Sequence, residues 1–276
     1  MAFLRRRYGA RLFFIYFQAF TSTYAPASVL RDRYDEAIAA ARRVLARGLA
    51  QGSPDSDPSD QTLRYGREEG DCMPAIAGDG LRGLVVSTRP DCVDESVVDL
   101  LASYAERGLE LWVELGLQSA HDRTLRAIGR GHDRAAFERA VRFLEGRGTR
   151  IAAHVILGLP GEGRADMIET AREVAALGLD GVKFHDLRIL SGTRLEREYL
   201  AGEIAPMHPT RLPGILADCI EELPPGCEVM RLCADAPAAA TIVPRRPPDK
   251  AALYRAVEDE LASRGTRQGA GFGRAR

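Results

Sequence analysis

The sequence lacks closely spaced cysteines, a long apolar run and an excess of charge of either sign. No two of its five cysteines are separated by two or three residues, and their odd number at irregular spacing does not indicate a secreted disulfide framework. The cysteines are Cys72, Cys92, Cys219, Cys227 and Cys233. No segment approaches ~18 uninterrupted apolar residues, so the sequence offers no candidate transmembrane helix.

The charge balance excludes binding that depends on a strong overall field. With 38 basic and 39 acidic residues, the net charge is −1, and no global attraction to nucleic acid or to a membrane surface follows. The first 27 residues partly resemble a secretory signal, but Gln18 interrupts their short apolar run, and an aromatic strand explains the same residues. We therefore predict a cytoplasmic protein with no membrane partner.

Short apolar runs alternate with helical patterns through most of the chain. The apolar runs predict strands at 12–18, 84–87, 109–115, 151–157 and 181–185. Apolar residues at helical spacing predict helices at 29–47, 94–107, 121–128, 133–147 and 164–177. This alternation is typical of an α/β fold with a parallel sheet, either a barrel or a doubly wound sheet.

Two regions depart from this alternation. Residues 50–80 are rich in Gly, Ser, Asp and Pro, and they predict a mobile insertion within a core formed by residues 1–200. Residues 201–276 predict a C-terminal helical extension. Its expected elements are a helix at 208–222, a strand at 228–232, a helix at 250–263 and a disordered tail from Gly265 onward.

Polar residues gather where the predicted strands end. In parallel α/β folds, ligands bind at the carboxyl ends of the strands. The polar residues at these ends are Gln18, Thr21, Thr23, Arg89, Asp91, Glu114, Gln118, Ser119, Glu162 and His185. Arg89, Asp91 and His185 are the candidate catalytic residues, whereas His154 and Trp112 are interpreted as core residues.

The stretch IAAHVILGLPGE, residues 151–162, is the centre of this pattern. It reads as a buried strand that runs into a glycine-rich turn and then directly into a helix. Gly158 and Gly161 would let the backbone approach a ligand closely at the end of the strand.

An ordered set of motifs resembles a known family. The motifs are YFQAFTSTYAP (16–26), STRPDC (87–92), LWVELGLQSAHDRTL (111–125), GRGHD (129–133), AHVILGLPGE (153–162) and RGTRQG (264–269). Together they resemble an uncharacterised bacterial subgroup of the radical S-adenosylmethionine (SAM) proteins, similar in its core to elongator-type enzymes that act on the tRNA wobble uridine. The resemblance implies a partial (βα)6 TIM-like barrel whose first strand is missing.

The resemblance also implies cofactors and roles for site residues. The family reaction is the reductive cleavage of SAM to a 5′-deoxyadenosyl radical by a four-iron, four-sulfur (4Fe-4S) cluster that an electron donor reduces. The motif whose backbone packs against the adenine is matched by Ile156, Gly158, Gly161 and Glu162. The motif that reaches the ribose and the carboxylate is matched by Glu114, Gln118 and Ser119. The strand that meets the amino group of SAM is matched by Gln18, Thr21 and Thr23.

The cluster motif is where the sequence departs from the family. The family's CxxxCxxC loop, whose thiolates hold the cluster, has no counterpart in the sequence, so no metal ligand is assigned. We therefore expect a truncated chain that is inactive as given.

Three functions stay open at this point. The first is a radical SAM enzyme of unknown substrate, with the tRNA wobble uridine as one candidate. The second is a cluster-free remnant or a module that binds SAM or a nucleotide without catalysis. The third is an unrelated α/β-barrel enzyme that uses Glu114 and Asp91 as acid and base.

Overall fold

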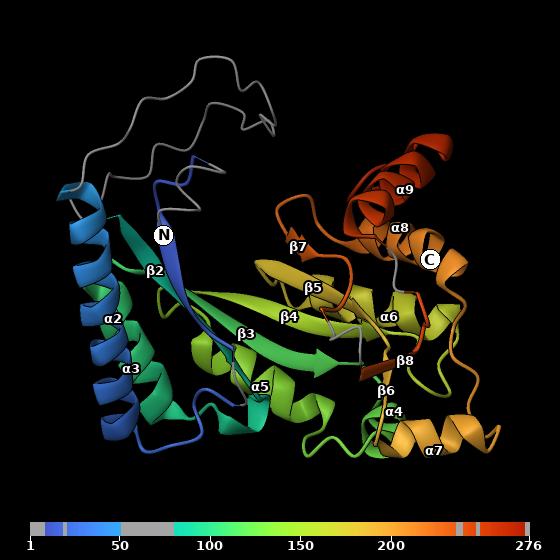
Figure 1. The fold of residues 1–276 in the computed structure, drawn as a ribbon, viewed down its shortest axis with the longest axis horizontal. Coiled ribbons are helices and arrows are strands. Elements are labelled where there is room, and N and C mark those ends of the chain that lie inside the picture. Colours follow the sequence, from blue (N-terminus) through green and yellow to red (C-terminus); the bar gives the residue numbers. More distant parts are fainter. Residues whose placement is uncertain (1–8, 19–20, 51–79, 236–239, 247–248, 274–276) are drawn as a thin grey trace.

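The computed structural model describes residues 9–18, 21–50, 80–235, 240–246 and 249–273. Its centre is a curled parallel sheet of six strands, a half-barrel, in the order β1-β2-β3-β4-β5-β7 (Figure 1). The strands are β1 (Phe13–Phe17), β2 (Leu81–Thr88), β3 (Glu110–Gln118), β4 (Thr149–Leu157), β5 (Gly181–Asp186) and β7 (Glu228–Arg231). The partial TIM-like barrel predicted from the sequence is confirmed. Residues 51–79 of the predicted insertion lie outside the described part of the chain.

Helices connect successive strands, as the alternating pattern predicts. They are α2 (Ala27–Ala50), α3 (Glu95–Glu106), α4 (Asp122–Ala127), α5 (Arg134–Leu144) and α6 (Arg164–Ala176). Acidic residues begin several of these helices: the Asp94 carboxylate accepts a hydrogen bond from the Val97 N–H (3.0 Å) at the start of α3, and Asp133 caps α5 in the same way. Figure 1 shows α2 and α3 side by side at the β1 end of the sheet.

The strand β3 lies at the centre of the core. Its residues 111–117 are all buried, because helices cover one face of the sheet and the curled interior encloses the other. Trp112 is 4% exposed, which confirms its interpretation as a core residue. This continuous burial leaves room for a charged residue at position 114 only if other side chains neutralise it.

The C-terminal part adds two helices and a small second sheet. The strands β6 (Ile189–Leu190) and β8 (Thr241–Val243) pair antiparallel, and α7 (Arg194–Leu200) follows β6. The predicted helix at 208–222 begins with a 3₁₀ turn, Pro209–Arg211, and continues as α8 (Leu212–Glu222), and α9 (Lys250–Ser263) matches its predicted bounds. Within the described ranges, no helix combines the length and the apolar character needed to cross a bilayer.

The tail after Gly265 is ordered through Gly273, so the prediction of disorder is wrong there. The N–H groups of Gly269 and Gly271 donate to backbone carbonyls of α8 at 3.4 and 2.8 Å. The Gln268 side chain also donates to two backbone carbonyls of the loop after α8, at 2.8 and 2.7 Å. The prediction came from composition, which does not register these specific contacts.

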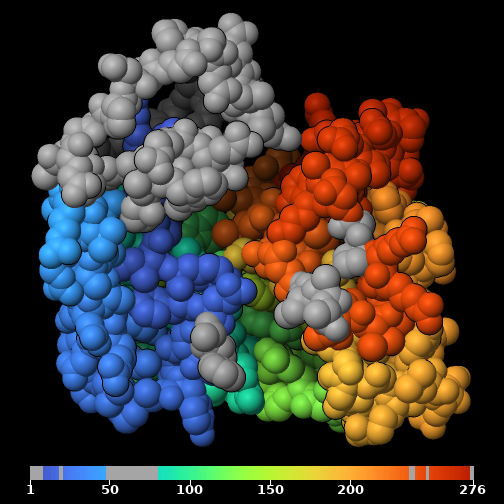
Figure 2. Space-filling model, viewed as in Figure 1, coloured from blue at the N-terminus to red at the C-terminus, as the bar shows by residue number. Residues whose placement is uncertain are grey.

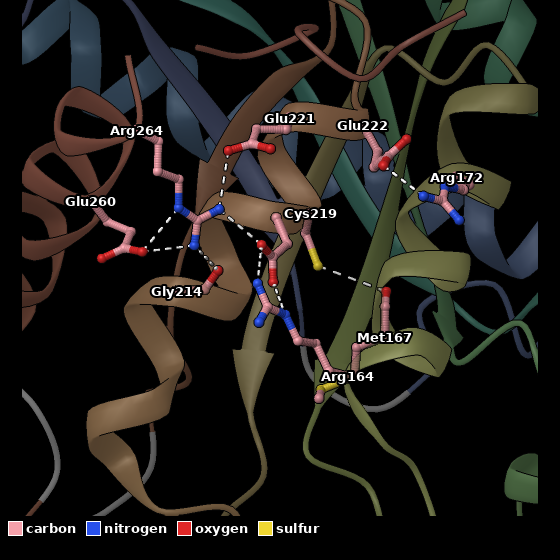
Figure 3. A network of polar contacts seen from close by, with 10 residues as sticks. Arg164, Met167, Arg172, Gly214, Cys219, Glu221, Glu222, Glu260 and Arg264 are labelled. Carbon is pink, nitrogen blue, oxygen red and sulfur yellow. Dashed lines mark hydrogen bonds and ion pairs between the residues drawn. The ribbon is translucent and has the colours of Figure 1, made fainter. Parts of the chain in front are cut away.

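An ion-pair network joins this end of the chain to the barrel (Figure 3). The Arg264 guanidinium, at the end of α9, donates to Asp218 on α8 at 2.8 Å and to Glu260 at 2.7 Å. The same Asp218 carboxylate accepts two hydrogen bonds from Arg164 on α6, at 2.6 and 2.7 Å. Asp218 is 8% exposed and therefore needs both guanidinium groups. The network fixes α6, α8 and α9 to one another.

Candidate functional site

A cavity of about 310 Å³ lies where the carboxyl ends of the strands β1 to β4 meet. It is lined by Thr21, Ser87, Thr88, Arg89, Gly116, Gln118, Arg130 and His154. Its volume is at the lower end of the range for small-molecule sites, and its lining is polar. The space-filling view shows residues from the middle of the chain, in green, between the N-terminal part in blue and the C-terminal part in orange and red (Figure 2).

The end of β3 has an irregular backbone at the cavity. The register between β3 and β4 shifts between Gly116 and Gln118, so that Gln118 pairs with Val155. Gln118 has φ 68°, a left-handed conformation that is uncommon for a residue with a side chain and often marks a functional position. A Cβ atom at Gly116 would lie 2.7 Å from the Gln118 amide nitrogen. The missing side chain at Gly116 therefore makes room for the polar groups of the cavity.

Two arginines face the cavity: Arg89 is paired with a carboxylate, whereas Arg130 contacts a histidine ring and a backbone carbonyl. Arg89 donates two hydrogen bonds to the Asp91 carboxylate, at 2.9 and 2.5 Å. Burial alone would raise the pKa of Asp91, but these hydrogen bonds lower it. Arg130 instead donates to the His132 ring at 2.8 Å and to a backbone carbonyl, and among the described residues no carboxylate is a hydrogen-bond partner of Arg130. Burial, together with repulsion from Arg89, lowers the pKa of Arg130. The Arg130 guanidinium is a ready site for an anion.

Behind the cavity, Glu114 is the centre of a buried ionic cluster. Its carboxylate accepts hydrogen bonds from the Tyr16 hydroxyl (2.6 Å) and the His154 Nε2 (2.8 Å), and the Lys183 ammonium contacts its other oxygen. Burial favours protonation, but the hydrogen bonds from His154, Lys183 and Tyr16 outweigh it and lower the pKa of Glu114 to about 2. Side chains from three strands, β1, β4 and β5, thereby converge on one carboxylate of β3 inside the half-barrel.

His185 lies beside this cluster. Its ring stacks on the His154 ring, with centroids 5.3 Å apart and an interplanar angle of 27°. Its Nε2 is buried and has no hydrogen-bond partner within the described part of the chain. Burial, with the nearby His154 ring and the charge of Arg231, lowers the pKa of His185 to about 4, so the ring is neutral.

The turn after β4 supplies backbone without bulky side chains. Gly158 and Gly161 have φ 84° and 80°, so both use the left-handed conformation that glycine adopts without strain. The Ser119 hydroxyl donates to Glu162, which ties the end of β3 to this turn. The Asp166 side chain accepts from the Gly163 N–H (2.8 Å) and so begins α6 directly after the turn.

The predicted site residues separate into two groups. Arg89, Thr21 and Gln118 line the cavity. The others do not line the cavity: Glu114 and His185 are in the buried cluster on the strands, Thr23 bonds to Thr88, Asp91 to Arg89, and Ser119 to Glu162. Gln18 is exposed at the carboxyl end of β1. Ile156, Gly158 and Gly161 form the end of β4 and the following turn.

Sequence reasoning assigned no role to five residues of the cavity wall. These are Ser87, Thr88, Gly116, Arg130 and His154. Arg130 belongs to the motif GRGHD, for which the sequence predicts no role, and His154 was interpreted as a core residue. The alternation within β4 was a usable signal, because a polar residue in an apolar strand points to one defined face of the sheet.

The described cysteines do not fit an iron–sulfur cluster. Cys219 is buried within α8, and its Sγ contacts the Met167 carbonyl at 3.7 Å. Cys227 and Cys233 flank β7 and are also buried, while Cys92 ends a short 3₁₀ helix, Pro90–Cys92, between β2 and α3. In the described ranges, no three His, Cys, Asp or Glu side chains are placed to share a metal ion. Cys72 lies outside these ranges.

The comparison with protein families identifies the class. The chain belongs to the radical SAM superfamily, because the sequence pattern of this superfamily matches residues 30–174. The radical SAM C-terminal domain matches residues 179–263. This membership confirms the resemblance seen in the motifs. The family's cofactors are SAM and a 4Fe-4S cluster.

Particular relatives extend this result. The chain is 34% identical to the protein YhcC of Escherichia coli over 85% of its own length and 64% of that protein, so it spans just under two thirds of YhcC. It is 27% identical to the tRNA uridine(34) acetyltransferase of Dehalococcoides mccartyi over 56% of its length and 34% of the relative. Among solved structures, Elp3 of Methanocaldococcus infernus has a TM-score of 0.60 at 23% identity, covering 69% of this chain and 44% of the other. The last match supports the fold.

Proposed function

We propose that the cavity at the carboxyl ends of β1 to β4 binds SAM. The observation that carries this proposal is the Arg130 guanidinium, which faces a polar cavity and has no carboxylate partner. SAM has a carboxylate that a guanidinium binds with two parallel hydrogen bonds. The hydroxyls of Thr21 and Ser87 would accept hydrogen bonds from its amino group, and the Gln118 amide would bind the ribose.

The adenine would lie over the turn that follows β4. Gly158 and Gly161 present backbone without a side chain there, and the Ile156 side chain gives an apolar contact at the end of the strand. The donors and acceptors of the cavity match the polar end of SAM, and the turn after β4 matches its flat adenine ring. In this arrangement the chain binds and orients SAM between β1 and β4.

The chemistry of bound SAM in this family is cleavage at its sulfonium to give a 5′-deoxyadenosyl radical. The described cysteines do not fit the cluster that this step requires, so we derive no radical step from them. We propose radical chemistry for the whole protein and SAM binding for the part described. The alternative of a cluster-free SAM-binding module rests on the same cavity.

The acid/base alternative loses its support. Family membership excludes an unrelated barrel. Glu114, with its pKa lowered to about 2 and both oxygens engaged, is a poor proton acceptor at neutral pH. Asp91 is held by Arg89 in the same way, and its pKa is also lowered.

We further propose that the substrate is a nucleoside within tRNA. The support is the relative that carries tRNA uridine(34) in its name, together with its match over 56% of the chain. The net charge of −1 does not add to this support. Titration of unfractionated tRNA into the purified protein tests the proposal, and the absence of salt-dependent binding would contradict it.

Calorimetric titration of SAM into the purified chain tests the main proposal. We expect saturable binding of SAM that Arg130→Gln weakens about 10- to 100-fold, because a charge-assisted contact with the carboxylate is lost. Arg126→Gln is the matched control, since Arg126 is exposed on α4 and does not line the cavity. Equal affinities of the two variants, or no heat with the wild-type chain, would contradict the proposal.

A further inference from the structure

We propose that Glu114 is a positioning residue that fixes His154 as the hydrogen-bond acceptor for a ribose hydroxyl in the cavity. The inference rests on the proposed function of the cavity as a SAM site. It gives Glu114 a role different from the direct ligand contact that the motif match implies.

Both oxygens of the Glu114 carboxylate already accept contacts from buried protein side chains. One carboxylate oxygen accepts from both Tyr16 and His154, and Lys183 contacts the other. The side chain is 0% exposed, and it does not line the cavity. Any influence of Glu114 on a bound molecule must therefore pass through one of its three partners.

Among these partners, His154 is the one that lines the cavity. A deprotonated carboxylate can only accept a hydrogen bond, so the His154 Nε2 in contact with Glu114 carries a proton. In the neutral ring, Nδ1 then has a free lone pair and acts as an acceptor. The His154 side chain is 15% exposed and lines the cavity, whereas Glu114 is 0% exposed, and from this we infer that the Nδ1 edge faces the cavity.

Two neighbours hold the ring in this orientation. The stacked His185 ring restricts rotation of His154 from one side. The contact with Glu114 at 2.8 Å fixes the Nε2 edge. The Nδ1 edge is thus presented in a constant direction without help from a ligand, and this preorganisation lowers the entropy lost on binding.

The chemistry of the cavity wall selects the ligand group. The wall has no carboxylate, and Arg89 and Arg130 can only donate. His154 pairs in register with Gly116, and the Gln118 amide nitrogen lies 2.7 Å from where a Gly116 Cβ would be, so His154 and Gln118 line the same part of the wall. Neighbouring acceptor and amide groups match the two neighbouring hydroxyls of a ribose.

The tautomer of His154 gives the first test and needs no ligand. Long-range ¹H–¹⁵N correlation spectra of the ¹⁵N-labelled chain at pH 8 should show His154 as the neutral Nε2–H form, with the signal assigned by its loss in His154→Gln. In Glu114→Gln, the new amide can donate to Nε2, and we expect the Nδ1–H form to appear. Glu110→Gln is the control, because Glu110 is on the same strand but binds Arg82 and Trp112. An Nδ1–H or doubly protonated His154 in the wild-type chain would overturn the proposal.

Ribose analogues give the second test. S-adenosylhomocysteine and its 2′-deoxy and 3′-deoxy forms are titrated into the wild-type chain and into His154→Phe. The phenyl ring can still stack on His185, but it has no nitrogen and so offers no hydrogen-bond acceptor to a ribose hydroxyl. One deoxy analogue should bind the wild-type chain about tenfold more weakly than the parent compound, and this difference should disappear in His154→Phe.

The outcomes separate this inference from the proposed function. If S-adenosylhomocysteine binds but loses the same affinity on deoxygenation in both chains, His154 is not the acceptor, and the SAM site itself stands. If no analogue binds the wild-type chain, the proposed function fails, whatever the tautomer. Should Glu114→Gln not fold, the wild-type spectrum and the His154→Phe titrations still decide the question.

Discussion

His185 is a neutral imidazole in a cationic neighbourhood. Burial and the charges of Arg231 and Lys183 lower its pKa to about 4, and its Nε2 has no partner within the described residues. Buried polar atoms without partners are rare in native proteins and often lie beside a bound ligand. His185 therefore connects the stability of the half-barrel to pH.

The first prediction concerns this pH dependence. In the unfolded chain, the pKa of a histidine is about 6.5, so between pH ~6.5 and ~4 only the unfolded state binds the proton. The free energy of unfolding should therefore fall by about 2–3 kcal/mol across this window as the pH decreases. Urea denaturation at several pH values measures it, and His185→Gln should remove this part of the slope.

His208→Gln is the matched control for this experiment. His208 is exposed, and its ring bonds only to Thr210 nearby. The His208 variant measures what the replacement of an exposed histidine by glutamine does by itself, so that the change caused by His185→Gln can be assigned to the buried site. A His185 variant with an unchanged slope would mean that His185 binds its proton equally in both states.

Single residues were the least predictable part of the site. Strand ends could be located from the sequence, and with them Thr21, Arg89 and Gln118 at the cavity. Which polar groups pair with each other could not be predicted, because Tyr16, Glu114 and Lys183 are up to 167 residues apart in sequence. Their contacts arise from the inward alternation of three strands and from the sheet order, which only the fold defines.

At the scale of elements, the connection from β4 to α6 depends on glycine. Gly158 has φ 84°, and an added Cβ would lie 3.3 Å from the Met207 Cβ. Its N–H points to the Met167 sulfur at 3.2 Å, so the turn packs against the first part of α6. The turn therefore has little freedom to move away from Met207.

A second prediction concerns the stability of the chain after the substitution Gly158→Ala. The left-handed backbone alone should cost about 1 kcal/mol, and the tight contact with Met207 should add to it. Gly178→Ala isolates the first effect, because Gly178 has φ 63° and open space around its Cβ position. Urea denaturation should give a larger loss for Gly158→Ala than for Gly178→Ala. Equal losses would show that Met207 moves aside without cost.

Element prediction succeeded where hydrophobic patterns were long. The five strands and the helices α2, α3, α5, α6 and α9 follow from periodicity, because burial on one or both faces sets the spacing of apolar residues. The strands β6 and β8 were missed, since two or three residues carry no readable period. The ordered tail was missed because hydrogen bonds from Gln268, Gly269 and Gly271 to α8 and the following loop hold it, which composition does not reveal.

At the scale of the whole molecule, the described cysteines do not match the cofactor that the family uses. The family uses a 4Fe-4S cluster, and such clusters are held by thiolates. Burial is the main cause that raises the pKa of the Cys219 thiol, and it raises that of Cys227 to about 11. Both thiols are therefore protonated at neutral pH and poor ligands for iron.

The last prediction follows from this arrangement. After anaerobic incubation with iron and sulfide, the 276-residue chain should not retain a 4Fe-4S cluster, and it should not form 5′-deoxyadenosine from SAM when dithionite is added. Heat of SAM binding should remain, because the cavity uses Arg130 and Gln118 rather than cysteine. Iron analysis, the absorption spectrum and product chromatography measure the three results. Cys72→Ala is the informative variant, since Cys72 lies outside the described residues: a cluster that forms in the wild-type chain and is lost in this variant would contradict the prediction and identify Cys72 as a ligand.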